Sequence, residues 1–487
     1  LEGLAVVVRR VQRGVEEAFY AALDDIKTRQ TSFAAAAVAT VQTSTSDTPA
    51  LLPRMRPAVG EPWKGRLWRF EQYNEFVEKG YDGGAAYGDL NGDGDFEDVF
   101  VVEDTGSSAP TATNIVVENT DGVFVRTGTD AGVATPFWEA NARLKTNLTA
   151  GGVSARKVWT VLDTDGDGSF TSADTVTRLQ STGVTATDLR MAEYMGLRSN
   201  TYYCPSASGA GQLMSELDMS ITKAATITST TVSTVVTQDQ YDLICVRLVL
   251  LWVNGADLLD QDGDLNYTEP RIDILGDIFH SSPVLVDPPV EAFLCSLGLS
   301  NQCARTLFEK NLPVTVTPLE DANVTSTVGG SICGATTRNP YDVYVYERRK
   351  RDKLAVVGAN DGMVHAFVNG RFVSETCEAG QVLTTFNKGT GDEAWAFVPP
   401  DLLPQLIDTI LEHTYTVDGD IMARDIWADG SGSTTADGKK QWNEYHTLLV
   451  VSEGRGGKHY FALEPQFDAT TGQVTDRPAF RWMFPQP

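Results

Sequence analysis

Three short segments dense in aspartate constrain this chain more than any other feature of its sequence. The fullest, residues 163–174, places acidic side chains at loop positions 1, 3, 5 and 12 and glycine at position 6. Carboxylates this close repel one another unless a cation joins them, and Ca²⁺ takes about six to eight oxygen ligands from a turn with glycine at its bend. The spacing therefore predicts a calcium loop whose ligands are Asp163, Asp165, Asp167, Ser169 and Asp174.

The other two segments, 89–98 and 260–269, repeat the opening of this pattern but close two residues earlier, with a carboxylate at position 10. The last one departs furthest, because Leu265 stands where the pattern has glycine. An aspartate-rich turn that binds no ion is the alternative for each. With a backbone carbonyl at position 7, the predicted ligands are Asp89, Asn91, Asp93, Asp95, Asp98, Asp260, Asp262, Asp264, Asn266 and Glu269.

Acidic residues also dominate the whole chain, with 65 Asp and Glu against 39 Lys and Arg and a formal net charge of −26. Such a charge repels nucleic acid and anionic lipid surfaces, so neither is expected as a partner. The chain has no run of about 18 apolar residues, and no direct membrane span is expected. It starts at Leu1 without a leader sequence, which predicts that it is a piece of a longer protein.

The six cysteines include no CxxC pair and have no histidine at zinc-ligand spacing. Their even number favours disulfides in an exported protein, with buried free thiols in a cytosolic protein as the alternative. The pairing stays open, although Cys295 and Cys303 are near enough to close a small loop. The remaining four are Cys204, Cys245, Cys333 and Cys377.

Apolar periodicity predicts a helix at the start of the chain and mostly strands after it. Apolar residues recur every three or four positions from Leu4 to Ile26, which lines one face of a helix. Residues 63–70 alternate like an exposed strand. The Thr- and Val-rich stretches between 105 and 240, such as 225–236, favour strands because β-branched side chains fit a pleated surface.

Short apolar runs closed by turn residues follow at 354–357 and 446–451, and they are typical of strands in a sandwich or propeller. The one later helix is expected at 400–413. The segment 454–458 lacks the glycine spacing of a phosphate-binding loop and is interpreted as a turn. No HExxH or GxSxG motif is present, so hydrolase chemistry has no support, and His280 is interpreted as structural.

Five segments of this chain resemble the PilY-type pilus biogenesis proteins and occur in the same order as in that family. Three more, at 32–38, 63–70 and 156–160, resemble its entry into the propeller more loosely. The extra Asp-rich loops depart from the family, so the calcium ligands named above come from spacing alone. The five segments are LGDIFHSSPVLV at 275–286, VVGANDGMVHAF at 356–367, EAWAFVPP at 393–400, VDG and DIW within 417–427, and GRGGKHYFAL at 454–463.

The resemblance implies a mainly β fold. It would be a partial quinoprotein-like β-propeller with an inserted β region that carries the calcium loops, preceded by the final helix of a von Willebrand A-type domain. The expected domains are 1–50 for the end of that upstream domain and a linker, 51–274 for the region with the Asp-rich loops, and 275–487 for propeller blades that continue past residue 487.

The resemblance also implies a calcium-binding adhesin and assembly factor at the tip of type IV pili rather than an enzyme. Expected partners are the minor pilins at the tip and a surface or host receptor, and the expected location is extracellular after export through the periplasm. Two alternatives stay open. One is a quinoprotein-like dehydrogenase, which shares the propeller and calcium, and the other is a calcium-dependent carbohydrate-binding surface protein unconnected to pili.

Overall fold

The computed structural model describes residues 37–38, 49–58, 62–72, 101–104, 115–118, 123–126, 132–289, 340–378, 381–432, 435–438 and 440–486. The predicted helix from Leu4 to Ile26 and the predicted loop 89–98 lie outside these ranges, as do Cys295, Cys303 and Cys333. Within these ranges, no helix has both the length and the apolar character that crossing a membrane requires.

The described strands form four sheets, none of them closed, which confirms the prediction of a mainly β protein. The first sheet is antiparallel in chain order, with one extra strand pairing with β3. It confirms that 63–70 forms a strand, but the strand is not an exposed one, because Leu67 and Arg69 are fully buried. Its strands are β1 (Ala37–Val38), β2 (Pro49–Arg56), β3 (Lys64–Gln72), β4 (Val101–Val102), β5 (Ile115–Glu118), β6 (Phe124–Arg126) and β7 (Trp138–Glu139).

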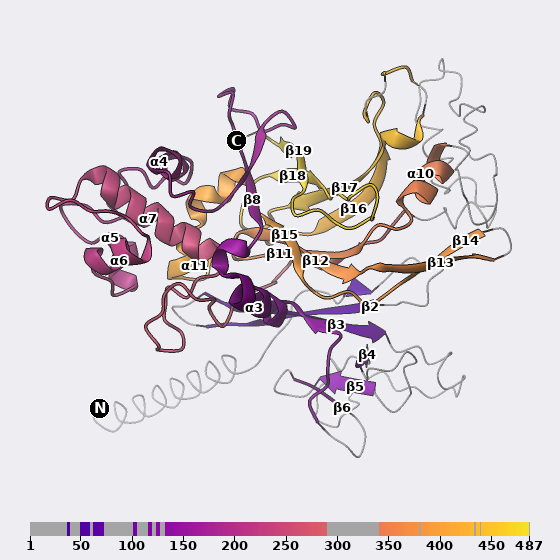
Figure 1. Ribbon diagram of the computed structural model, residues 1–487, viewed down its shortest axis with the longest axis horizontal. Coiled ribbons are helices and arrows are strands. Elements are labelled where there is room, and N and C mark those ends of the chain that lie inside the picture. Colours follow the sequence, from indigo (N-terminus) through magenta and orange to yellow (C-terminus); the bar gives the residue numbers. More distant parts are fainter. Residues whose placement is uncertain are drawn as a thin grey trace, which may run out of the picture.

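The second sheet lies at the centre of the molecule (Figure 1) and joins strands far apart in the sequence. Its order is β10 (Val284–Val286), β11 (Lys353–Ala359), β12 (Met363–Gly370), β15 (Glu393–Phe397), β8 (Val158–Leu162) and β9 (Thr175–Arg178). Neighbours pair antiparallel except β15 and β8, which run parallel. A separate hairpin of β13 (Phe372–Glu378) and β14 (Gln381–Phe386) connects β12 to β15.

The last sheet is an antiparallel meander in chain order. It consists of β16 (Ile421–Trp427), β17 (Tyr445–Ser452), β18 (Tyr460–Glu464) and β19 (Ala479–Phe484). Together with β11, β17 confirms the strands predicted at 354–357 and 446–451.

The central sheet is covered on both faces, which explains why every residue of β11 is buried. Leu354 and Val356 on one face pack with apolar residues of β16–β19, such as Leu449 and Phe461. The alternate residues, including Val357, pack on the other face against β2, β3 and α3 (Ala140–Gly151). Because side chains alternate across a strand, the apolar residues of β11 contribute to two cores, one on each face of the sheet.

The prediction of strands between 105 and 240 is confirmed at β5 to β9 but is wrong for the residues after β9, including 225–236. Helices gather there at one end of the molecule (Figure 1). They are α4 (Thr185–Tyr194), α5 (Gly211–Glu216), α6 (Ile221–Ile227) and α7 (Gln238–Val253). The helix α3 and the short η2 (Val153–Ala155) precede β8, and α3 packs against β3 instead. Thr237 and Gln240 form a reciprocal capping box at the start of α7, and Ser220 caps α6. Caps and a shared apolar core therefore override the strand preference of Thr and Val.

Two further corrections concern helices in the second half. The helix predicted at 400–413 is a 3₁₀ segment, η3 (Pro400–Gln405), followed by the single-turn α11 (Asp408–Leu411), because Pro404 interrupts the helical hydrogen bonds. The helix α10 (Pro340–Arg348) has no counterpart among the predictions, and a short 3₁₀ segment, η4 (Trp442–Glu444), precedes β17.

A disulfide joins Cys204 to Cys245 of α7, with the Cα atoms 5.5 Å apart. Both residues are fully buried in the helical core. The disulfide prediction is therefore confirmed for this pair.

Candidate functional site

The predicted loop 163–174 is the connection of a β-hairpin, because Leu162 of β8 pairs with Thr175 of β9. Its turn is held by carboxylates that accept backbone N–H groups. The two oxygens of Asp163 accept from Gly166 N and Gly168 N at 2.6 and 3.0 Å, and Asp165 accepts from Asp167 N at 3.2 Å. This arrangement keeps the acidic side chains on the inside of the turn.

The loop 260–269 repeats three side-chain contacts of the first loop at the same positions, although Gly263 N donates to the backbone carbonyl of Asp260 rather than to its side chain. Asp260 Oδ1 accepts from Leu265 N at 2.9 Å, Asp262 Oδ1 from Asp264 N at 3.3 Å, and Asp264 Oδ1 from Asn266 N at 2.7 Å. In the first loop the last of these corresponds to Ser169 N on Asp167 Oδ1, also 2.7 Å. The two loops therefore adopt similar turn conformations.

Leu265 adopts the left-handed conformation that glycine has at the same position of the first loop. Its φ is 68°, against 77° for Gly168. An L-residue reaches this region only at a cost of about 1–2 kcal/mol, since Cβ approaches the following carbonyl. The departure at Leu265 thus leaves the turn intact and places strain in it.

The base of the second loop is closed by a short antiparallel pairing that brings a buried acid under the turn. Asp257 N donates to Glu269 O at 2.9 Å, and Arg271 N donates to Gly255 O at 2.9 Å. Asp257 is 1% exposed, and its Oδ1 has no hydrogen-bond partner among the described residues. Glu269 Oε1 is likewise buried without one.

Of the ten predicted ligands that the structure describes, seven come together in three groups, in each of which one oxygen per residue lies within 4.8 Å of the others. They are Asp163 with Asp165 and Asp174, Asp260 with Asp262 and Asp264, and Asp257 with Asp262 and Glu269. Asp167 is not in these groups, and its Oδ1 accepts from Ser169 N. Asn266 Oδ1 accepts from the N–H and hydroxyl of Thr268. The ligands predicted at Asp89, Asn91, Asp93, Asp95 and Asp98 lie outside the described residues.

Asp257 is the residue that the spacing pattern missed. It stands three positions before Asp260, between Ala256 and Leu258, where it looks like part of an apolar segment. The one signal in the sequence is a fifth acid close to the four of this Asp-rich loop.

The electrostatics of the two loops differ. Burial opposes ionisation of Asp163, but the Gly168 and Gly166 N–H groups outweigh it and lower the pKa. Burial raises the pKa of Asp257, and the charge of Asp262 adds to this despite the Gln261 N–H. The pKa of Glu269 is raised by burial and then by the charges of Asp264 and Asp262. The first loop also crowds charges, because the Asp167 N–H lowers the pKa of Asp165 but burial and the charges of Asp167 and Asp174 outweigh it. The second loop differs in the buried acid Asp257 beneath its turn.

These donor sets fit a hard divalent cation such as Ca²⁺. All the side-chain donors are oxygens, and each loop gathers at least three carboxylates on a tight turn. The unpartnered oxygens of Asp257 and Glu269 are ones that a cation would satisfy. In the first loop the ligands would be Asp163, Asp165 and Asp174, and in the second Asp257, Asp260, Asp262, Asp264 and Glu269.

A separate buried network joins the segments that carry the family resemblance. His365 contacts Glu393 Oε1 through Nδ1 at 2.8 Å and Asp361 Oδ1 through Nε2 at 3.1 Å. Arg156 binds both oxygens of Glu393, at 2.9 and 3.0 Å. Burial alone would lower the pKa of His365, but Asp361 and Glu393 outweigh it and raise this pKa to about 9. The pKa of Glu393 is lowered to about 2, because the Arg156 charge overcomes the opposing effect of burial.

Asn360 extends this network to two further histidines. Its Nδ2 donates to Asp277 Oδ2 at 2.7 Å and lies 3.3 Å from Asp418 Oδ1. Asp277 also contacts His413, while Asp418 contacts His280 Nδ1 at 2.5 Å. Four of the five resembling segments therefore meet in one buried set of polar contacts, consistent with the structural role interpreted for His280.

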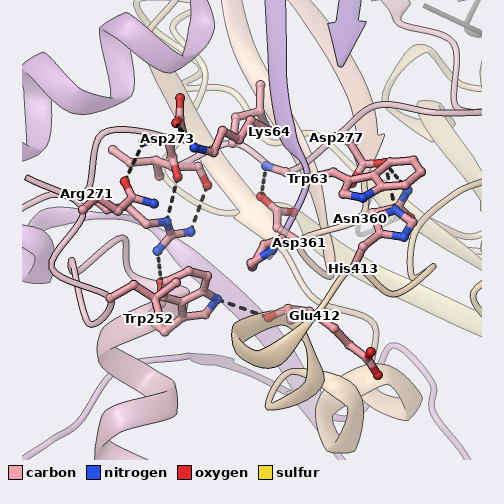
Figure 2. Close-up of a pocket in the computed structure, with 17 residues that line it drawn as sticks. Trp63, Lys64, Trp252, Arg271, Asp273, Asp277, Asn360, Asp361, Glu412 and His413 are labelled. Atoms are coloured by element: carbon pink, nitrogen blue, oxygen red, sulfur yellow. Dashed lines mark hydrogen bonds and ion pairs between the residues drawn. The ribbon is translucent and has the colours of Figure 1, made fainter. Parts of the chain in front are cut away.

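Beside this network lies a cavity of about 40 Å³, shown in Figure 2. Arg271 lines it, with its guanidinium 3.9 Å from the Trp252 ring centre and its N–H groups on three backbone carbonyls. Burial and then the nearby Arg156 lower the pKa of Arg271 to about 9. Trp63 closes one side by stacking on His413 at 3.8 Å. A cavity of this volume has room for waters.

Two known proteins are similar to parts of this chain. One is a type IV pilus biogenesis factor PilY1 homolog of Xylella fastidiosa (strain Temecula1 / ATCC 700964), 33% identical over 132 residues, which cover 26% of this chain and 8% of that protein. The other is the type IV pilus biogenesis factor PilY1 of Pseudomonas aeruginosa (strain UCBPP-PA14), 25% identical over 197 residues, 39% of this chain and 11% of that protein. No family model and no solved structure matches. The resemblance to PilY1 proteins is thus supported over a part of the chain.

Proposed function

We propose that this chain is a calcium-binding module of a type IV pilus biogenesis factor, which supports pilus assembly and surface attachment at the pilus tip. The observation that carries the calcium part is the shared turn of loops 163–174 and 260–269, which holds carboxylates together with unpartnered oxygens beneath the second loop. The pilus part rests on the similarity to two PilY1 proteins.

Calcium in these loops would couple the stability of the module to its surroundings. Each ion would bridge carboxylates that otherwise repel, so the folded state gains the binding free energy. The first loop sits on the central sheet through β8 and β9, and the second follows α7 directly. Extracellular calcium would therefore stiffen two places on the same core.

The proposed architecture is a partial β-propeller, with boundaries at 1–50, 51–274 and 275–487. Two observations support the blades. Strands β10, β11, β12 and β15 form one four-stranded antiparallel run, and β16–β19 form another. Four antiparallel strands are the unit of a propeller blade, and here the two runs pack face to face.

The proposed setting is extracellular, with the minor pilins of the tip and a surface or host receptor as partners. The Cys204–Cys245 disulfide supports an oxidising compartment such as the periplasm or the cell exterior. The net charge of −26 supports a partner that is neither nucleic acid nor anionic lipid.

We also propose that the module is not an enzyme. A quinoprotein-like dehydrogenase would need room for an organic cofactor, and sites for such molecules have volumes of roughly 300 Å³ or more. The cavity beside Arg271 has about 40 Å³. An assay for dehydrogenation of alcohols and sugars with added quinone cofactor tests this proposal, and turnover would overturn it.

Calorimetric titration with Ca²⁺ tests the proposed calcium sites directly. The chain should bind Ca²⁺ at both described loops, and Asp165→Asn or Asp262→Asn should each remove one binding event. Asp468→Asn is the matched control, because Asp468 also accepts N–H groups in an exposed turn, from Thr470 and Thr471, but lies in none of the carboxylate groups. If both loop variants bind as many Ca²⁺ ions as the wild type, the two loops are turns that bind no ion.

The pilus role is tested in cells that make type IV pili and lack their PilY-type factor. The full-length protein should restore surface pili and attachment, and the same protein with Asp165→Asn and Asp262→Asn should restore them less well. Restoration by neither protein would argue against the pilus role. Equal restoration by both would mean that pilus assembly does not depend on calcium binding at these two loops.

A further inference from the structure

A second kind of metal-binding geometry lies away from the Asp-rich loops, where the β17–β18 turn meets η3. His459 Nδ1 lies 2.8 Å from Asp401 Oδ2 and 3.5 Å from Glu453 Oε2. One ligand atom from each of the three residues lies within 4.8 Å of the others. Asp401 comes from η3, whereas Glu453 and His459 flank the turn that follows β17.

Two oxygens of this cluster are buried without a donor. Glu453 is fully buried, yet its Oε1 has no hydrogen-bond partner among the described residues, and the same is true of Asp401 Oδ1. Among the described residues, the one cationic side chain within ion-pair distance of either carboxylate is His459. The fully buried Glu453 carboxylate and the partly buried Asp401 carboxylate thus share a single imidazole, which is costly unless a further positive charge joins them.

A histidine and a carboxylate on the same sheet show what a fully partnered arrangement looks like. His446 Nδ1 lies 2.9 Å from Glu464 Oε1, and the other oxygen of Glu464 is bound by Arg481. His446 Nε2 contacts Ser431 Oγ at 2.7 Å. Glu464 therefore carries a full set of partners, and Glu453 does not.

The turn is shaped to admit the Glu453 carboxylate. A Cβ on Gly457 would lie 1.8 Å from Glu453 Oε2, so only glycine fits there. The N–H of His459 donates to the same oxygen at 2.9 Å and fixes its orientation. Burial, followed by the charge of Asp401, raises the pKa of Glu453 to about 8, consistent with two carboxylates that face each other.

We propose that Asp401, Glu453 and His459 form a site for a divalent transition metal of the Zn²⁺ class. An imidazole nitrogen with two carboxylates suits Zn²⁺ better than Ca²⁺, which prefers oxygen ligands alone. Tetrahedral Zn²⁺ with ligands at about 2.0–2.2 Å places them roughly 3.3 Å apart, and the two distances from His459 Nδ1 bracket that value. The fourth position would be open to water or to a group from a partner.

Metal titrations of the whole chain, saturated with Ca²⁺, test this site. Zn²⁺ should bind one further equivalent that excess Ca²⁺ does not displace, and Co²⁺ in its place should give visible absorption bands from the same site. Both His459→Asn and Glu453→Gln should weaken Zn²⁺ binding by more than about 10-fold, because each removes a ligand. His446→Asn is the matched control and should leave the affinity unchanged.

Further variants separate this site from the calcium loops and from misfolding. Zn²⁺ binding should survive in the Asp165→Asn, Asp262→Asn chain, so the result does not depend on calcium binding. His459 is 13% exposed, so His459→Asn should fold even if Glu453→Gln does not, which circular dichroism checks. Absence of the additional Zn²⁺ equivalent, its persistence in folded His459→Asn, or its displacement by Ca²⁺ would each overturn the proposal.

Discussion

The network around His365 and the acidic group around Asp257 hold buried carboxylates in opposite ways. Glu393 has Arg156 and His365 as partners, and Asp361 has His365 and the Gly276 N–H. Asp257, by contrast, lies near Asp262 and Glu269 and has an oxygen without a donor. The network pairs its carboxylates with Arg156 and His365, whereas no described residue forms an ion pair with Asp257, Asp262 or Glu269, and Arg271 acts on Asp257 only from a distance. Burial of acids thus indicates a ligand site only where no ion-pair partner is supplied by the described residues.

Removing the internal cation should have the largest effect. Arg156→Met should lower the free energy of unfolding by about 3–5 kcal/mol, because Glu393 stays buried without its bidentate partner. Arg143→Met is the control, since its pair with Asp392 is partly exposed and should contribute less than about 1 kcal/mol. Urea denaturation in saturating Ca²⁺ measures both, and similar losses in the two variants would contradict the contrast.

The network should also give a stability that falls at alkaline pH. The folded pKa of His365, about 9, lies above the ordinary value near 6.5, so its contribution is complete below the latter and is lost as pH rises through about 9. The loss should amount to roughly 3 kcal/mol. The free energies of unfolding of wild type and His365→Gln, measured between pH 6 and 10, test this. If both fall equally with rising pH, groups other than His365 cause the loss of stability.

Removing one acid from the group around Asp257 should destabilise the chain in Ca²⁺ and stabilise it in chelator. Asp262→Asn should weaken Ca²⁺ binding at loop 260–269 by more than about 10-fold, or about 1.4 kcal/mol. In chelator the same variant should melt higher than wild type, because the Asp262 charge raises the pKa values of Asp257 and Glu269. Melting curves with and without Ca²⁺ measure this. A lower melting temperature in both conditions would mean that Asp262 stabilises the turn itself.

The smallest effect should come from Leu265. Leu265→Gly should stabilise the chain by up to about 1 kcal/mol, since it relieves the left-handed strain and Leu265 is 70% exposed. Gly168→Ala should do the reverse in the first loop, where an added Cβ meets nothing within 4 Å and only the backbone conformation is penalised. Thermal melts of both variants test the pair, and destabilisation by Leu265→Gly would show that the leucine side chain packs usefully.

The strands of the second half could be predicted because their apolar runs are short and bounded by turn residues, as in β11 and β17. The helices at 185–253 could not. Inside the predicted strand 225–236, Thr228 instead ends α6, because its Oγ1 donates to Ala224 O and pairs with Thr230 Oγ1. Caps such as Thr237 are present in the sequence, but the high content of Thr and Val favours strands and hides them.

The site shows the same limit. Aspartate spacing placed Asp163 with Asp165 and Asp260 with Asp262, since these contacts are local to a turn. Asp257 joins this group only through the backbone pairing at the base of the loop, where its N–H donates to Glu269 O, and residue spacing does not predict that pairing. Asp401 and Glu453, more than fifty residues apart, meet through tertiary packing that spacing does not encode.

The parallel pairing of β8 with β15 sets an order of events as the chain is made. Thr160 Oγ1 donates to Val398 O across 238 residues, so the hairpin that carries loop 163–174 has no place on the central sheet until β15 exists. Closing so long a loop is slow compared with forming a meander such as β16–β19. The β8–β9 hairpin must therefore wait for the second half of the chain, and until then its unpaired strand edge is a surface that a chaperone would need to cover.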